Sequence, residues 1–299
     1  MQRIKNESGS QLKFWFLAFR PKTLTAALVP IVASTALVSA LQFTVHWRIS
    51  IYALLASIFI QIGTNLVNDA ADFKKGADKE DRLGPKRVTQ SGIFSYRAVM
   101  MMGSFFFFIA VLCGFPLVMI GGWPIVFIGV VSILCGYAYT TGPFPLAYRG
   151  MGDIFVILFF GLIAVSGLFY LHTHEWRIEA FVLGLQVGLH CAVLIAINNL
   201  RDIDGDKLVD KKTLPVRFGK QFARYEIAFL CFLPFLLLTY WIQVGFAWVG
   251  IGLLALPLAI RLSIKIFKNE PGPIYNKFLA QSAGLHILFG SLLALGLLL

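Results

Sequence analysis

Four polar side chains interrupt the end of a long apolar stretch. Asn65, Asn68, Asp69 and Asp72 close a run that is otherwise hydrophobic. If the run is helical, these positions fall at i, i+3, i+4 and i+7, so two carboxamides and two carboxylates share one face. Clustered carboxylates repel one another unless a cation joins them, and their oxygens are the ligands that Mg²⁺ prefers. The spacing therefore predicts a site for a divalent cation.

A second stretch repeats this pattern later in the chain. Asn198, Asp202 and Asp206 follow another apolar run at i, i+4 and i+8, again on one helical face. No His or Cys accompanies either stretch in the sequence, which argues against zinc or copper. We expect the two acidic helix ends to meet and to hold Mg²⁺. The candidate metal ligands are Asn65, Asn68, Asp69, Asp72, Asp202 and Asp206.

Basic loops beside both stretches predict that the cation shares an anionic ligand. Mg²⁺ keeps several waters and binds readily to substrate phosphates, and Lys and Arg are frequent just after each acidic stretch. The sequence lacks the GxxxxGK[ST] loop of soluble nucleotide-binding proteins. A lipid diphosphate fits better, because its tail can lie among apolar helices. The candidate anion-binding residues are Arg20, Lys22, Arg82, Arg87, Arg201 and Lys211.

The composition places these stretches in a polytopic membrane protein. Of the 299 residues, 58% are hydrophobic and 14% are charged, and the mean hydropathy is +0.77. A spanning helix needs roughly 20 apolar residues. The predicted fold is thus all-α, with about nine transmembrane helices in one bundle. The nine candidate runs are residues 23–41, 49–69, 98–119, 123–140, 153–171, 180–200, 225–243, 247–264 and 278–298.

The distribution of basic residues predicts the orientation in the membrane. With a cytoplasmic N-terminus, 24 of the 26 Lys and Arg residues fall on the inner side, and Arg48 and Arg177 fall outside. This bias predicts that the C-terminus is outside and that both acidic stretches lie at the cytoplasmic end of their helices. It also accounts for the net charge of +11, so the charge does not indicate a nucleic-acid partner. We expect one transmembrane domain over residues 1–299, with a cytoplasmic segment at 1–13 and cytoplasmic cap loops at 73–97 and 201–224.

The motifs resemble those of the UbiA superfamily of intramembrane aromatic prenyltransferases. Asn68-x3-Asp72 and Asp202-x3-Asp206 are similar to its paired Asp-rich motifs. The resemblance is finer to the branch that prenylates 1,4-dihydroxy-2-naphthoate in menaquinone biosynthesis. It is carried by Arg20-Pro-Lys-Thr-Leu24, Asn65-Leu-Val-Asn68-Asp69-x2-Asp72-x3-Gly76-x-Asp78, Asp81-Arg82-Leu-Gly84-Pro85, Gln90-x-Gly92, Tyr148-x-Gly150-x-Gly152-Asp153 and Asn198-Asn199-Leu-Arg201-Asp202.

Three positions depart from the wider superfamily. Gly76 stands where many members have a third acid, with Asp78 nearby. The Tyr-x3-Lys pattern found elsewhere in the superfamily is absent after Tyr139, which precedes Thr-Thr-Gly-Pro. Asp210 stands where Gly is common before Lys211, which leaves the shape of that loop open.

The resemblance implies a multi-pass enzyme of the bacterial inner membrane with its active site on the cytoplasmic side. A polyprenyl diphosphate would be the donor and 1,4-dihydroxy-2-naphthoate the acceptor, with loss of carbon dioxide and formation of demethylmenaquinol. Mg²⁺ would assist departure of the diphosphate. Tyr139 would shelter the allylic cation by a cation–π contact worth about 2 kcal/mol when desolvated. The catalytic residues implied are Asp72, Asp202, Asp206 and Tyr139, and Gln90 and Asn199 join the basic residues above as substrate contacts.

Two alternatives stay open. The acceptor could be another aromatic or tetrapyrrole compound, such as a tocopherol or chlorophyll precursor. From a different functional class, a secondary transporter also places polar residues on interrupted helices. A transporter predicts a site near the membrane midplane, whereas both acidic stretches are predicted at one membrane surface.

Overall fold

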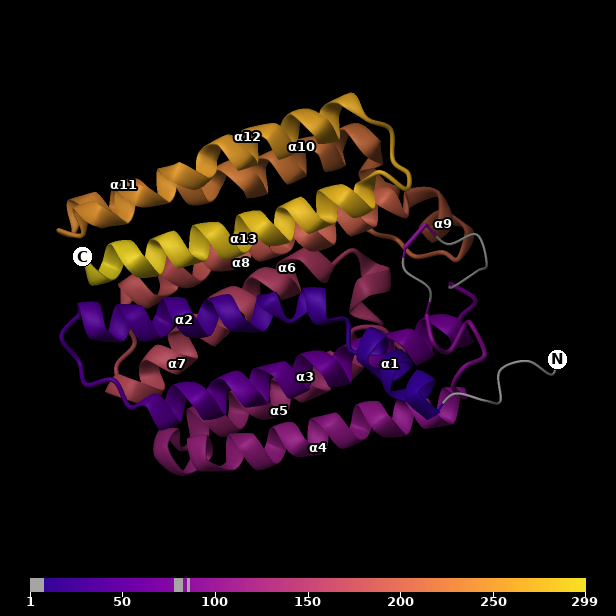
Figure 1. Cartoon of the computed structure of the whole chain (residues 1–299), viewed down its shortest axis with the longest axis horizontal. Helices are drawn as coiled ribbons and strands as arrows, with labels where there is room; N and C mark the ends of the chain where they lie inside the picture. The colour runs from indigo at the N-terminus through magenta and orange to yellow at the C-terminus, as the bar shows by residue number, and fades with distance from the viewer. Residues whose placement is uncertain (1–7, 78–82, 85–86) are drawn as a thin grey trace.

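The protein is an elongated bundle of helices, described here by a computed structural model that covers residues 8–77, 83–84 and 87–299. The long helices run side by side along the longest axis of the molecule (Figure 1). No strand occurs within the described residues, so the predicted all-α class is confirmed. In chain order the elements are α1 (Ser8–Ala18), η1 (Pro21–Thr23), α2 (Thr25–Ala40), α3 (Trp47–Lys74), α4 (Tyr96–Gly121), α5 (Trp123–Ala138), η2 (Leu146–Arg149), α6 (Gly152–Ile157), η3 (Leu158–Ile163), α7 (Ala164–Thr173), α8 (Ile178–Arg201), α9 (Ile203–Leu208), α10 (Leu214–Leu236), α11 (Leu238–Gln243), η4 (Ala247–Ala255), α12 (Leu256–Lys268) and α13 (Tyr275–Leu298).

Each of the nine predicted apolar runs lies in a helical segment. Within the described residues, seven segments are long and apolar enough to cross a membrane: α3, α4, α6 to α7, α8, α10 to α11, η4 to α12, and α13. The helices α2 and α5 are apolar but have 16 residues each. At 1.5 Å per residue that is about 24 Å, less than the roughly 30 Å of a hydrocarbon core. The multi-pass membrane class is confirmed, whereas the number nine and the orientation stay predictions.

The helix α10 begins earlier than its apolar run. Thr213 has an extended backbone as the N-cap, and a proline at the second helical position fixes a helical φ angle without requiring a donor. Gly219 then interrupts the helical backbone with φ 88° and ψ 169°. Residues 214–224, which were predicted to lie in a cap loop, therefore form helical turns on either side of the break at Gly219.

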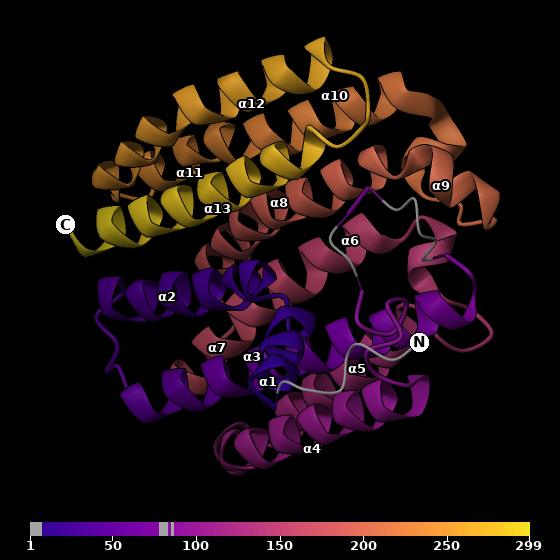
Figure 2. The ribbon, with the colours of Figure 1, turned by 45° about the vertical axis from the view of Figure 1, so that its right-hand side comes forward.

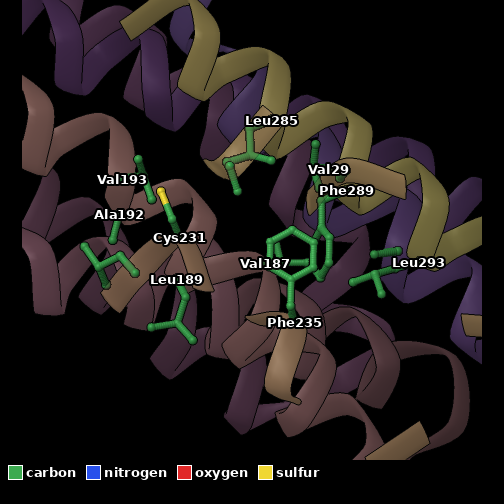
Figure 3. Packing of buried hydrophobic residues seen from close by; sticks show 14 of the residues in the cluster. Val29, Val187, Leu189, Ala192, Val193, Cys231, Phe235, Leu285, Phe289 and Leu293 are labelled. Atoms are coloured by element: carbon green, nitrogen blue, oxygen red, sulfur yellow. The ribbon is translucent and has the colours of Figure 1, made fainter. Parts of the chain in front are cut away.

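The largest apolar cluster lies between α8, α10 and α13. Val187, Phe235 and Phe289 pack against one another at its centre (Figure 3). Trp241 and Gln186 are hydrogen-bonded nearby: the indole Nε1 of Trp241 donates to Gln186 Oε1 at 2.7 Å, and Gln186 Nε2 donates to a backbone carbonyl of α10 at 2.9 Å. Because lipid tails are as apolar as these side chains, close packing and such hydrogen bonds hold the helices together.

Small residues allow α8 to approach the π-helical turn η3. Gly184 and Gly188 are four residues apart on α8 and face Gly161. A Cβ atom on Gly188 would lie 2.7 Å from the carbonyl oxygen of Ile157, so only glycine fits at this contact. The contact fixes α6 and η3 against α8, the helix that ends in the second acidic stretch.

The two acidic helix ends lie at the same end of the bundle. Figure 2 shows the end of α3, the start of α6 and the short helix α9 gathered there, with α1 lying across α3. The C-terminus lies at the opposite end (Figure 1). The fold thus brings together residues that are more than a hundred positions apart in the sequence.

Candidate functional site

Asp72 is held by groups from two other segments. Its Oδ1 accepts a hydrogen bond from the Tyr148 hydroxyl at 3.0 Å, and its Oδ2 forms an ion pair with Arg87 at 3.1 Å. All three residues are buried. A carboxylate has about four acceptor positions, so these two contacts leave acceptor capacity on Asp72.

The neighbouring residues Asn65 and Asp69 hold segments that carry predicted site residues. Asp69 accepts from the backbone N–H of Val88 at 3.3 Å and of Thr89 at 3.2 Å, one bond to each carboxylate oxygen. Asn65 Nδ2 donates to the Phe19 carbonyl and to Thr23 Oγ1, both at 3.1 Å. Asp69 therefore fixes the segment that follows Arg87, and Asn65 fixes the turn around Arg20.

Asn68 faces the connection between α5 and η2. Its Oδ1 accepts from Thr140 Oγ1 at 2.7 Å, and the carbonyl of Thr140 accepts from Lys75 Nζ at 2.7 Å. The Lys75 ammonium also lies 4.1 Å from the centre of the Tyr148 ring. Desolvation lowers the pKa of Lys75, and the Asp72 carboxylate opposes this shift. A cation thus lies beside the first acidic stretch.

In the second stretch, Asp202 is paired with its neighbour Arg201. The guanidinium donates to both carboxylate oxygens, from Nε at 2.8 Å and from one terminal nitrogen at 2.6 Å. Arg201 is 2% exposed and also donates to Asn198 Oδ1 at 2.7 Å and to Asn276 Oδ1 at 2.8 Å. Asn276 in turn donates to the Leu83 carbonyl at 2.8 Å. Arg201 therefore ties the second stretch to α13 and to the loop after α3.

Asp206 has one carboxylate oxygen paired and one without a partner among the described residues. Lys211 Nζ donates to its Oδ1 at 3.2 Å. Its Oδ2 is buried and has no hydrogen-bond partner among the described residues. Burial raises the pKa of Asp206, Lys211 lowers it, and the carboxylates of Asp202 and Asp72 raise it further. By contrast, the side chain of Asp204 is 79% exposed, so it points away from the site.

One chain of contacts joins the two acidic stretches. Tyr148 donates to Asp72, its ring centre lies 5.9 Å from the Lys211 ammonium, and Lys211 donates to Asp206. The backbone supports this bridge, because the N–H of Lys212 donates to the Tyr148 carbonyl at 3.0 Å. The structure therefore brings Asp72 and Asp206 into one electrostatic environment, with cations between them.

The other predicted residues lie around this centre. The hydroxyl of Tyr139 lies close to Gly152, because a Cβ atom added to Gly152 would be 2.9 Å from it. The carboxylates of Asp72 and Asp206 are near enough to act electrostatically on the Tyr139 hydroxyl. Arg20 adopts a left-handed backbone with φ 54°, and Gln90 is half-buried in the turn held by Asp69. Asn199 is buried on α8. Arg82 and Asp78 lie outside the described residues, as does the side chain of Lys22.

Two of the sequence departures have a backbone explanation. Gly76 has φ 71° at the end of α3, where the N–H of Ala77 bonds back to the Asp72 carbonyl at 2.9 Å. This left-handed position favours glycine over an acid. Asp210 also has a positive φ, 51°, and Asp tolerates that conformation better than most residues. The loop before Lys211 therefore keeps a shape that Gly would adopt.

Sequence reasoning missed several partners in this centre. The sequence patterns do not indicate Thr140, Lys75 or Asn276, and Tyr148 enters only as part of the Tyr148-x-Gly150-x-Gly152-Asp153 motif. Tyr148 could have been found, because an aromatic residue followed by closely spaced glycines is unusual between two spans. Nothing in the sequence around Asn276 indicates its contact with Arg201.

The side chains present fit a hard cation such as Mg²⁺. Carboxylate and amide oxygens are its preferred ligands, and the buried Oδ2 of Asp206 is available to one. Within the described residues, no three His, Cys, Asp or Glu side chains are grouped closely enough to hold a metal by themselves. Amide oxygens, water or an anionic ligand would therefore have to complete the shell, which is how Mg²⁺ commonly binds.

Comparison with known proteins assigns the family. The model of the UbiA prenyltransferase family matches residues 27–285. A 1,4-dihydroxy-2-naphthoate octaprenyltransferase from Haemophilus influenzae is 33% identical over 99% of both chains, and one from Escherichia coli is 32% identical over 97% of this chain and 96% of its own.

Solved structures agree on the fold. The apo structure of a UbiA homolog from Aeropyrum pernix K1 has a TM-score of 0.67 and 16% identity, covering 91% of this chain and 97% of its own. A UbiA homolog from Archaeoglobus fulgidus bound to DMAPP and Mg²⁺ has a TM-score of 0.62 and 16% identity, covering 93% and 98%. The sequence and the fold agree, and this chain belongs to the UbiA prenyltransferase family.

Proposed function

We propose that this protein transfers a polyprenyl group from a polyprenyl diphosphate to 1,4-dihydroxy-2-naphthoate, with loss of carbon dioxide and formation of demethylmenaquinol. The reaction takes place at the cytoplasmic end of the bundle, in a bacterial inner membrane. The observation that carries the proposal is the bridge from Asp72 through Tyr148 and Lys211 to Asp206. The naphthoate octaprenyltransferase names of relatives that span nearly the whole chain support the acceptor.

Asn68, Asp72, Asp202 and Asp206 would hold Mg²⁺ partly through water molecules and the diphosphate, since no three described acidic side chains are grouped closely enough to hold a metal by themselves. When bound, Mg²⁺ supplies positive charge that stabilises the departing diphosphate. A related protein of the same fold has been solved with DMAPP and Mg²⁺, which supports this choice of cation. Asn65 and Asp69 act indirectly, since their polar atoms hold the backbone of neighbouring segments.

Cationic side chains would bind the diphosphate beside these acids. The ammonium groups of Lys75 and Lys211 lie 4.1 and 5.9 Å from the centre of the same Tyr148 ring, so both reach one region. Arg87 adds a guanidinium through its ion pair with Asp72, and a guanidinium can bind phosphate oxygens in pairs. Arg20 is placed at the same end of the bundle by the turn that Asn65 holds.

The remaining chemistry depends on Tyr139 and on the exclusion of water. Ionisation of the donor leaves an allylic cation, which the Tyr139 ring can stabilise by cation–π attraction. The apolar helices around the site keep away water that would otherwise add to the cation. A ring carbon of the acceptor attacks the cation, and loss of carbon dioxide returns an electron pair to the ring and restores its aromaticity.

An acceptor panel tests this assignment. Membranes that contain the protein are incubated with Mg²⁺, prenyl diphosphates of several lengths and different acceptors, and the product mass is measured. We expect a prenylated naphthoquinol that has lost the mass of carbon dioxide. Prenylation of hydroxybenzoate or of a tetrapyrrole in place of the naphthoate would refute the acceptor, and diphosphate-independent transport would refute the reaction.

Matched variants connect that product to the site. Asp72→Ala is expected to abolish product formation while the protein still inserts into membranes. Asp204→Ala serves as the control, because Asp204 belongs to the second stretch but its side chain is 79% exposed. Full activity of Asp72→Ala would overturn the proposed role of the first stretch.

A further inference from the structure

Three exposed basic residues from two segments gather on the surface beside the candidate active site. Arg149 ends the turn η2, Lys212 precedes α10, and Arg217 lies near the start of that helix. Arg217 Nε donates to the Lys212 carbonyl, and Arg217 Nη2 donates to the Arg149 carbonyl, each at 3.0 Å. All three residues are exposed. We call them the α10 basic cluster, and the start of α10 lies next to α9 at the end of the bundle that carries the acidic stretches (Figure 2).

The cluster lies directly outside the bridge that joins the two acidic stretches. Tyr148 and Lys211 reach the acids, whereas the residue that follows each of them, Arg149 or Lys212, is exposed. The Lys212 N–H donates to the Tyr148 carbonyl at 3.0 Å. A Cβ atom on Gly150 would lie 2.8 Å from the Lys212 carbonyl oxygen, so the two segments are in close contact. A ligand that holds the basic side chains together on the outside would therefore also hold the bridge on the inside.

The cluster carries more positive charge than its neighbours neutralise. Asp210 Oδ1 lies 3.5 Å from Lys212 Nζ, and the Asp210 side chain is 84% exposed. The Arg149 guanidinium lies 4.5 Å from the centre of the Phe144 ring. Among the described residues, neither Arg149 nor Arg217 forms an ion pair with a carboxylate. Three cations and one solvated carboxylate leave a net charge of +2, which favours an anionic ligand.

An exposed row of aromatic side chains leads away from the cluster along α10. Its members are 43–60% exposed: Phe218, Phe222, Tyr225 and Phe229. The ring centres of Phe218 and Phe222 are 4.9 Å apart. After the break at Gly219, positions 222, 225 and 229 fall at i, i+3 and i+7 on one helical face. Because α10 and α11 form a segment apolar enough to cross a membrane, this face meets lipid and the basic cluster lies at its polar end.

We propose that the α10 basic cluster binds the phosphate group of an anionic phospholipid, whose acyl chains lie along the aromatic row. Guanidinium groups donate paired hydrogen bonds to phosphate oxygens, and basic residues near an anionic membrane surface each add to the attraction. A zwitterionic lipid brings its own cation beside the phosphate, which the positive cluster repels. This binding requires no prenyl transfer, so it stands or falls independently of the proposed function.

Lipid binding is measured on the full-length, detergent-purified protein by native mass spectrometry. Titration with short-chain phosphatidylglycerol should show one saturable bound lipid, and phosphatidylcholine with the same chains should bind at least about fivefold more weakly. Arg149→Gln and Lys212→Gln each remove one charge, while Arg217 keeps its bonds to both backbone carbonyls. We expect each variant to raise the Kd for phosphatidylglycerol about fivefold, and the double variant to raise it roughly 25-fold.

Two controls separate this site from general attraction to anions. Lys268→Gln removes an exposed positive charge at the end of α12, and its Kd should stay within about twofold of the wild type. Glycerol phosphate, a head group without acyl chains, should not displace the lipid at equal concentration. The proposal is overturned if the double variant keeps the wild-type Kd, if Lys268→Gln weakens binding as much, or if phosphatidylcholine or glycerol phosphate competes equally well.

The bound lipid should also strengthen the bridge inside, a consequence that rests on the proposed function. In nanodiscs, product formation by the wild type should rise when phosphatidylglycerol replaces phosphatidylcholine, and this ratio should fall toward one in the double variant. A wild-type ratio of one, together with normal lipid binding, would overturn the link to the bridge. Absence of product in both lipids would count against the proposed function, whereas lipid binding is decided separately by mass spectrometry.

Discussion

The hydroxyl of Tyr148 offers the most specific test of how the site is built. It donates to Asp72 at 3.0 Å, and its ring centre lies 4.1 Å from the Lys75 ammonium and 5.9 Å from the Lys211 ammonium. Tyr148→Phe removes the hydroxyl and keeps the ring, so the cation–π contacts persist while Asp72 loses one donor. Hydrogen bonds to charged groups contribute about 1.5–3 kcal/mol. At about 1.4 kcal/mol per tenfold change, kcat/KM for the prenyl diphosphate should fall roughly 10- to 150-fold.

The assay measures prenylated product from a radiolabelled prenyl diphosphate at limiting Mg²⁺. Tyr137→Phe is the matched control, since the Tyr137 hydroxyl donates to Ser104 at 2.7 Å in an exposed position. We expect this control to stay within about twofold of the wild type. Both variants should elute as monodisperse protein after extraction. A kcat/KM of Tyr148→Phe equal to or above that of the wild type would refute the idea that Tyr148 orients Asp72.

Three further predictions follow from the contacts. Asp69→Ala leaves the buried N–H groups of Val88 and Thr89 without their acceptor. We therefore expect the free energy of unfolding to fall by about 2–4 kcal/mol, measured by thermal unfolding. An unchanged Tm would contradict the anchoring role of Asp69. Gly188→Val places a side chain against the Ile157 carbonyl and should reduce the amount of folded protein, whereas Gly114→Ala, with nothing within 4 Å of a Cβ, should not. Burial raises the pKa of Asp206, so protons compete with Mg²⁺ at a higher pH than for an ordinary carboxyl. Lowering the pH should therefore increase the Mg²⁺ concentration needed for half-maximal activity. The metal-free protein should become more stable as the pH falls, because folded Asp206 binds a proton at a pH where the same carboxyl in the unfolded chain has lost it. A Mg²⁺ requirement independent of pH would argue against Asp206 as a ligand.

The fold was predictable because hydrophobic runs mark membrane helices directly. All nine runs fall on helical segments, but 16 residues make α2 and α5 too short to meet the length of a straight span. The start of α10 could not be predicted from hydropathy, because four polar residues break the apolar sequence there: Arg217, Lys220, Gln221 and Arg224. The π-helical turn η3 lies where Gly161 approaches α8 closely, and such a tertiary contact has no signal in hydropathy.

For the candidate site, helical periodicity predicted that acids share one face of each stretch. Asp72 and Asp206 act on each other electrostatically, as expected for stretches that meet. Their roles within a stretch were not predictable, because Asp69 shares a face with Asp72 and yet bonds to backbone N–H groups. Tyr148 reaches Asp72 across 76 positions. Contacts over such separations depend on how the helices pack, which local sequence patterns do not specify.

The Mg²⁺ dependence of naphthoate prenylation in single variants of the two stretches tests the central claim most directly. Product formation is titrated with Mg²⁺ in the wild type, Asp72→Asn, Asp206→Asn and the control Asp204→Asn. If both stretches hold one Mg²⁺ site, both site variants should require at least about tenfold more Mg²⁺, or lose activity entirely, while Asp204→Asn matches the wild type. Product formation in the presence of a chelator, or an unchanged Mg²⁺ requirement in either site variant, would contradict a shared site.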